Sequence, residues 1–92
     1  MHPHHYVSNE QYKQQKSRLT RAQNTGNATA ILDAVEKTLN EWEGKAWPDD
    51  WHRWQRALHD AYFTFVCQAD PFLDGANQAL LQRFEEIQER LQ

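Results

Sequence analysis

The chain has 92 residues, 39% of them hydrophobic and 25% charged, with ten Lys and Arg against thirteen Asp and Glu and a net charge of −3. This length suits one domain, because a single core usually organises about 100–150 residues. The slight acidity excludes the overall basic character of most nucleic-acid-binding proteins. The one cysteine excludes an intramolecular disulfide framework and fits a reducing compartment. Without a secretory signal or an apolar run near the roughly 20 residues that span a bilayer, the sequence predicts a cytoplasmic protein with no membrane partner.

Residues 1–7 hold three of the five His residues and are expected to be flexible, because chain ends are poorly ordered unless something ties them down. Three interpretations stay open: a tag remnant or untidy native terminus, adventitious capture of Zn²⁺ or Ni²⁺, and a dedicated metal site. The last is the weakest, because no further ligand lies at a spacing that would complete the site. The remaining residues, 8–92, are predicted to form a single all-helical domain.

The first helix is predicted to begin after Ser8 and to stop before Gly26. Ser8 and Gln11 have the spacing of a capping box, in which both side chains satisfy free backbone amides. Gly26 suits the left-handed conformation that ends many helices. This helix is expected at the periphery of the fold, because it has only three apolar positions: Tyr12, Leu19 and Ala22.

A second, amphipathic helix should begin after Asn27 and stop at Gly44. A short connection over residues 45–49 then makes the second and third helices antiparallel neighbours. Trp42 and Trp47 flank this connection and are expected to pack on Trp51. The apolar residues of the second helix repeat at helical spacing: Ala28, Ile31, Leu32, Val35, Leu39 and Trp42.

The third helix is predicted over residues 47–66, with Pro48 in its first turn. Its apolar residues follow one another at steps of three and four, which place them on one stripe of an α-helix: Trp47, Trp51, Trp54, Leu58, Ala61 and Phe65. This Trp-rich helix is the predicted centre of the fold.

The opposite side of the third helix changes character along its length. Its first half is polar, but residues 61–67 are apolar nearly all round, which is typical of a buried segment. The first helix or a partner chain is therefore expected to cover Phe63 and Cys67. We expect Cys67 to be a buried structural thiol rather than a nucleophile.

The last helix is predicted to start at Asp70 or at Asp74, because Pro71 ends the third helix. Its apolar stripe comprises Leu73, Leu80, Phe84, Ile87 and Leu91, with Ala76 beside them. The predicted fold class is all-α, a small four-helix bundle-like domain. The last helix closes the main seam, and the first helix packs across the far side of the third.

No catalytic, cofactor or metal-binding signature is present. The sequence lacks the period-two alternation of strands and the glycine-rich loops that bind phosphates. His52 and His59 lie seven residues apart, about 10 Å along a helix, which is too far for one metal ion. We expect a protein that is not an enzyme and that uses no cofactor or metal.

Trp-rich stretches and arginines are also typical of protein interfaces. The Trp stripe itself is better explained as core, so the accessible candidates flank it or lie opposite. The predicted interface residues are His52, Arg53, Arg56, His59 and Phe63.

The basic residues of the first helix offer an alternative function, a small DNA- or RNA-binding regulator. They are Lys13, Lys16, Arg18 and Arg21. Phosphate contacts need only such donors. Packing of a basic helix beside acidic ones explains the same pattern, so both interpretations stay open.

The stretch from Arg18 to Ala61, and above all its string WPDDWxRWQRALxDA, resembles small uncharacterised all-helical proteins of phages and mobile elements. This resemblance implies a cytoplasmic protein with a host- or phage-directed binding role, and it brings no active residues with it. The expected function is a non-enzymatic protein-binding module, in this context an accessory or anti-defence inhibitor acting through charged helical surfaces. Its expected partner is a larger host or phage protein, with a homodimer as a further expectation.

Overall fold

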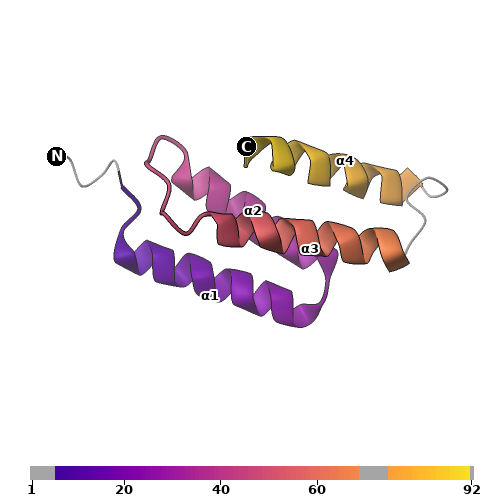
Figure 1. The fold of residues 1–92 in the computed structure, drawn as a ribbon, viewed down its shortest axis with the longest axis horizontal. Helices are drawn as coiled ribbons and strands as arrows, with labels where there is room; N and C mark the ends of the chain where they lie inside the picture. Colours follow the sequence, from indigo (N-terminus) through magenta and orange to yellow (C-terminus); the bar gives the residue numbers. More distant parts are fainter. Residues whose placement is uncertain (1–5, 69–74, 92) are drawn as a thin grey trace.

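The computed structural model describes residues 6–68 and 75–91, and within them the chain forms four helices. These are α1 (Asn9–Thr25), α2 (Ala28–Trp42), α3 (His52–Gln68) and α4 (Gly75–Arg90). Consecutive helices run antiparallel (Figure 1). An isolated parallel bridge joins Tyr6 to Ala46, and the described residues contain no named strand. The prediction of an all-α, four-helix bundle-like domain is confirmed.

Local capping sets the limits of the first two helices, as the sequence predicts. Ser8 Oγ accepts a hydrogen bond from the Gln11 amide at 3.2 Å, and Gln11 Oε1 accepts one from the Ser8 amide at 3.4 Å. Asn27 Oδ1 accepts bonds from two amides in the first turn of α2. Gly26 and Gly44 follow the two helices with φ of +66° and +77°, a left-handed conformation that favours glycine.

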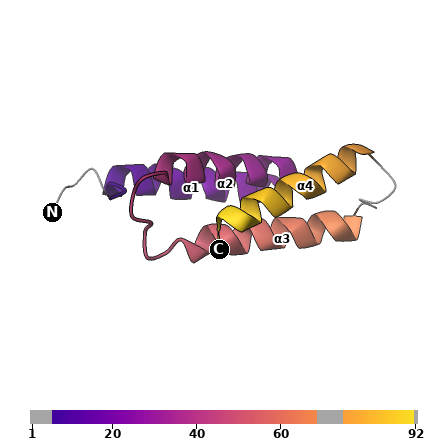
Figure 2. The same ribbon diagram turned by 90° about the horizontal axis from the view of Figure 1, so that it is seen from above.

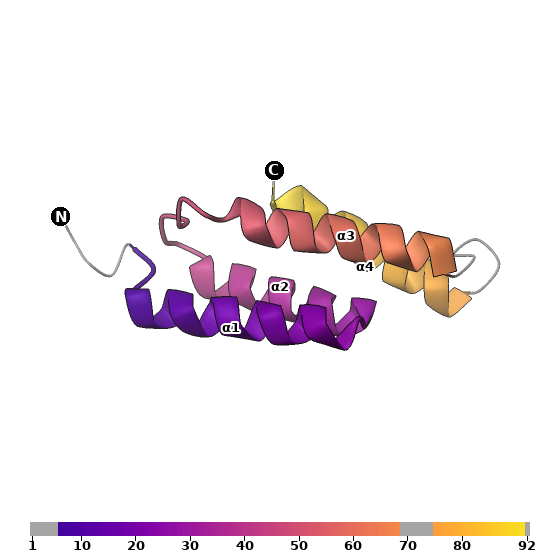
Figure 3. The same ribbon diagram turned by 60° about the horizontal axis from the view of Figure 1, so that its bottom comes forward.

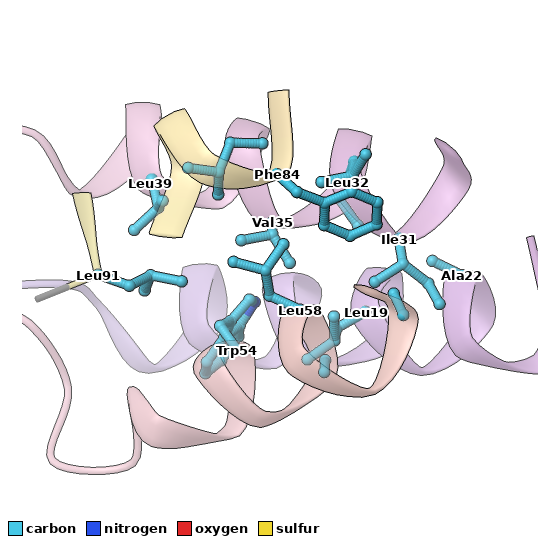
Figure 4. Packing of buried hydrophobic residues seen from close by; sticks show 14 of the residues in the cluster. Leu19, Ala22, Ile31, Leu32, Val35, Leu39, Trp54, Leu58, Phe84 and Leu91 are labelled. Carbon is cyan, nitrogen blue, oxygen red and sulfur yellow. The ribbon is translucent and has the colours of Figure 1, made fainter. Parts of the chain in front are cut away.

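The core lies where α2 faces the other three helices. The contacts of α2 with α1 and with α3 are the most extensive in the molecule, and α2 also packs on α4. Figures 2 and 3 show α1 and α2 side by side, α3 across from them, and α4 oblique to the rest. Figure 4 shows Val35, Leu58 and Phe84 from three of these helices meeting in the interior. Both α2 and the Trp-rich helix α3 contact all three other helices, but the contacts of α2 are the more extensive.

The polar edge of α2 also holds α4 in place. Arg83 of α4 donates to Asp33 at 2.6 Å and to Glu36 at 3.1 Å, and Arg90 donates to Asn40 at 2.9 Å. Exposed ion pairs contribute little stability, about 0–1 kcal/mol each. Their main effect here is to favour one rotation of α4 against α2.

The third helix begins at His52, so the prediction of a helix from Trp47 is wrong. Residues 48–51 instead form a turn in which the Trp51 amide donates to Pro48 O, and the Trp54 amide donates to Trp51 O at the start of α3. Such i to i+3 bonds wind the chain more tightly than an α-helix. The indoles still cluster as expected, with Trp47 5.6 Å from Trp42 and 5.4 Å from Trp51 between ring centroids.

The second half of α3 is covered on one side only, which corrects two further predictions. Phe65 is buried, but Phe63 is 65% exposed and Cys67 is exposed, so Cys67 is not a buried thiol. α1 does not cross this part of α3, because it packs along α2. Its ring contact with α3 joins Tyr12 to Trp54, near the start of the helix.

The apolar stripe of α4 is confirmed at its described positions. Phe84, Ile87 and Leu91 are buried and Leu80 is half-buried. Three predicted positions lie outside the described residues: the two alternative starts of the helix, Asp70 and Asp74, and the apolar Leu73.

A buried glutamine completes the inward face of α1. Gln15 is only 2% exposed and lies at helical spacing between Tyr12 and Leu19. Its Oε1 accepts a hydrogen bond from the buried Trp42 Nε1 at 2.8 Å. The other fully buried indole nitrogen, that of Trp54, has no partner among the described residues. Gln15 therefore satisfies a donor that the core would otherwise leave unpaired.

Replacing Gln15 with leucine should destabilise the fold although it adds apolar volume to a buried site. The buried Trp42 N–H would lose its acceptor, a loss worth about 1–3 kcal/mol. Urea unfolding followed by tryptophan fluorescence measures the change. Gln14→Leu, at an exposed position on the same helix, is the matched control and should change stability by less than about 0.5 kcal/mol. Equal effects of the two variants would contradict the role of Gln15.

A second polar link joins α1 to the turn before α3. Tyr12 Oη donates to Asp50 Oδ2 at 2.5 Å, and Arg53 Nε donates to the same oxygen at 3.0 Å. Both bonds lower the pKa of Asp50 below its ordinary 3.8, and the bond from Tyr12 has the larger effect. The pKa of Tyr12 is raised above its ordinary 10.0, mainly by burial and next by the bond to Asp50. The link therefore needs an ionised Asp50 and a neutral Tyr12.

The stabilising effect of this link should be lost at both ends of the pH range. Because its folded pKa is lowered, Asp50 contributes stability above its unfolded pKa, and this contribution is lost as pH falls through the folded pKa. Because its folded pKa is raised, Tyr12 contributes stability below its unfolded pKa, and this contribution is lost as pH rises through the folded pKa. Wild type should exceed Tyr12→Phe in stability most between about pH 5 and 9. The difference should shrink below pH 4 and above pH 10 in urea unfolding. A difference independent of pH would contradict the link.

Candidate functional site on the outer face of α3

One side of α3 points away from the core over the whole length of the helix. Residues at steps of four, three and four place this face opposite Trp54, Leu58 and Phe65, which are buried. We call it the outer face of α3, and it consists of His52, Arg56, His59, Phe63, Val66 and Cys67, all of them exposed.

The apolar part of this face is concentrated near Phe63. In the described part of the chain, four large apolar side chains are exposed, and three of them are Tyr62, Phe63 and Val66. Single exposed apolar residues are ordinary on protein surfaces, whereas a contiguous group marks an interaction site more often. Phe63, 65% exposed, forms the centre of this group.

The predicted interface residues divide into two groups. Arg56, His59 and Phe63 lie together on the outer face, and neither Arg56 nor His59 makes a hydrogen bond or ion pair with another described residue. Arg53 instead turns toward Asp50, and this ion pair raises the pKa of its guanidinium. His52 stacks on Trp51, with ring centroids 3.8 Å apart. The available part of the face therefore begins at Arg56.

A groove between α3 and α4 adjoins the outer face. Its volume is about 290 Å³, and its lining comprises Gln55, Arg56, Leu58, His59, Asp60, Tyr62, Phe84 and Gln88. Its apolar lining includes the buried Leu58 and Phe84, and the Tyr62 ring meets Phe84 edge to face at 5.5 Å. The sequence alone does not predict this groove, because its α4 wall depends on how α4 crosses α3.

The groove and the outer face carry groups suited to recognition rather than to catalysis. An exposed aromatic ring, a guanidinium and an imidazole can bury apolar surface and donate hydrogen bonds to a partner. Cys67 is exposed, but no described basic side chain forms a hydrogen bond or ion pair with it. Among the described residues, no three His, Cys, Asp or Glu side chains lie close enough to share a metal ion.

The basic residues of α1 are only partly available for phosphate. Arg18 forms an ion pair with Glu41 of α2, which is the intramolecular charge pairing that the sequence allowed. Lys16 Nζ lies over the Tyr12 ring, 5.2 Å from its centroid. Lys13 and Arg21 remain exposed. Two of the four basic residues are therefore engaged within the chain, which leaves Lys13 and Arg21 as the unengaged donors for phosphate.

Comparisons of the chain with protein-family models, with curated protein sequences and with solved structures give no match. Among the described residues, no helix is both long enough and apolar enough to cross a membrane. Function is therefore inferred from the chemistry of the outer face of α3 and of the groove beside it.

Proposed function

We propose that the chain is a non-enzymatic protein-binding module that presents the outer face of α3 and the adjoining groove to a larger partner. The observation that carries this proposal is the exposure of Phe63 at the centre of an apolar group, with His59 one turn and Arg56 two turns away on the same face. Aromatic residues and arginine dominate the energetics of many interfaces.

The energetics favour a partner that encloses Phe63. Complete burial of a phenylalanine side chain contributes about 1.5–3 kcal/mol, and this gain is still available because the fold leaves most of the ring in water. The groove offers the reverse contact, since the exposed Tyr62 ring lies in its lining beside the buried Leu58 and Phe84 and can pack on a side chain of the partner. Because the Phe63 ring projects and the groove beside it is concave, a partner needs a matching shape to bind both.

The resemblance to phage and mobile-element proteins suggests where such a partner is found. A larger host or phage protein fits a small chain of this kind, and an accessory or anti-defence role follows if binding blocks the partner. Arg56 and His59 favour a partner surface that carries carboxylates beside an apolar pocket. A second copy of the chain is the other candidate for the same face.

The fold itself should not need Phe63. Phe63→Ala should change the free energy of unfolding by less than about 0.5 kcal/mol, since surface substitutions rarely exceed this. Phe65→Ala makes the same chemical change two residues away at a buried position and should cost about 3–5 kcal/mol. Urea unfolding of both variants measures the contrast. A large loss of stability in Phe63→Ala would show that the ring belongs to the core.

Photocrosslinking in the native host tests binding directly. A photoreactive phenylalanine analogue at position 63 should form a discrete crosslinked product, whereas the same analogue at Thr20, exposed on α1, should not. With the purified partner, Phe63→Ala should weaken binding by roughly 30-fold, the effect of a hot-spot residue worth about 2 kcal/mol. Sedimentation of the isolated chain identifies a second copy as the partner. Equal crosslinking at both positions, or unchanged affinity, would contradict the proposal.

A further inference from the structure

A second concave site lies between residues 6–12 and the α2–α3 connection. The bridge between Tyr6 and Ala46 brings these two segments together. The pocket between them has a volume of about 600 Å³, within the range of about 300–1,000 Å³ that small-ligand pockets occupy. It shares no lining residue with the groove between α3 and α4, so it is independent of the proposed function.

The lining of this pocket combines aromatic rings with carboxylates. Tyr6, Tyr12 and Trp47 supply three rings, and Asp49 and Asp50 supply two negative charges. No Lys, Arg or His among the described residues lines it. Aromatic faces carry partial negative charge, so rings and carboxylates attract the same kind of group.

Only one of the two carboxylates has a cationic partner within the chain. Arg53 pairs with Asp50, whereas Lys45 Nζ donates to Gln11 Oε1 at 3.3 Å. Asp49 is exposed and makes no hydrogen bond or ion pair with another described residue. The pocket therefore carries a negative charge that the chain does not neutralise.

One of the three rings already attracts an ammonium group within the chain. Lys16 Nζ lies 5.2 Å from the centroid of Tyr12, within the roughly 6 Å range of cation–π attraction. Lys16 does not line the pocket. Trp47 is also held in place, by ring contacts to Trp42 and Trp51, so the aromatic wall needs little rearrangement to receive a ligand.

We propose that this pocket binds an organic cation, a quaternary or alkylated ammonium group, between Trp47 and Tyr6 with Asp49 as its counter-charge. Such a group is weakly hydrated and apolar at its surface, so it gains from the rings as well as from the carboxylate. An anion would meet the unpaired Asp49 carboxylate, and a neutral apolar group would gain nothing from that charge. The same chemistry is offered by a free small ammonium compound and by a methylated lysine on a peptide.

Choline is the probe, and 3,3-dimethylbutan-1-ol, its neutral carbon isostere, is the matched control ligand. Binding is followed by NMR through the indole N–H signal of Trp47 and the backbone amide of Ala46, at constant ionic strength. Choline should shift both signals in a saturable way and bind at least about fivefold more tightly than the isostere. A Gly-trimethyllysine-Gly peptide, titrated in the same way, tells whether the ammonium group belongs to a peptide or to a small compound. Tighter binding than choline assigns the site to a peptide. Equal or weaker binding assigns it to a small ammonium compound.

Two variants test the assigned residues without disturbing the core. Asp49→Asn and Tyr6→Ala change exposed side chains and should each weaken choline binding by roughly two- to fivefold, the size of one exposed cation–π or charge contact. Glu89→Gln removes the same charge from an exposed position on α4 and should leave binding unchanged. The proposal is overturned if choline causes no saturable shift, if the isostere binds equally well, or if Asp49→Asn binds choline as wild type does.

Discussion

The edge-to-face contact between Trp42 and Trp54 fixes the position of α2 relative to α3. Both indoles are completely buried, with ring centroids 4.8 Å apart and planes at 73°, an arrangement that aromatic pairs favour. One residue ends α2 and the other lies in the first turn of α3, so their contact closes the connection between the helices. α1 joins at the same point, because Tyr12 packs on Trp54 and Gln15 accepts the hydrogen bond of Trp42. These contacts hold three helices together. We call this cluster the aromatic joint, and it consists of Tyr12, Gln15, Trp42 and Trp54.

The molecule is packed unevenly as a result. At the aromatic joint, rings, a buried amide and a tyrosine–carboxylate link all converge. Toward the end of α3 the helix is held from one side, where Phe65 approaches Phe84 with ring centroids 5.8 Å apart. Phe63 lies on the opposite side of the helix and leaves most of its ring in solvent. In the proposed function this separation lets α3 pack on the core with one side and bind a partner with the other.

The parts of the fold that the sequence predicts correctly depend on local contacts. Ser8 and Gln11 cap α1 across three residues, and Asn27 caps α2 across two or three, so their spacing in the sequence contains the whole interaction. The start of α3 was missed because a tight turn over residues 48–51 also keeps Trp47 and Trp51 beside the core. Steps of three and four residues cannot distinguish such a turn from an α-helix. Spacing also identifies an apolar face without identifying the helix that covers it.

The candidate surfaces show the same division between local and distant contacts. Spacing alone placed Arg56 and Phe63 on the side of the third helix opposite its core stripe. It could not show that Phe63 stays exposed, because that depends on whether another helix packs on this side. The groove beside them was not predictable, because its far wall is Phe84, and neither was the N-terminal pocket, which needs Tyr6 placed beside Trp47 by the bridge at Ala46. Helix periodicity places side chains on a face, but only tertiary packing creates a concave site. The concave features are therefore where the structure adds most to what the sequence says about function.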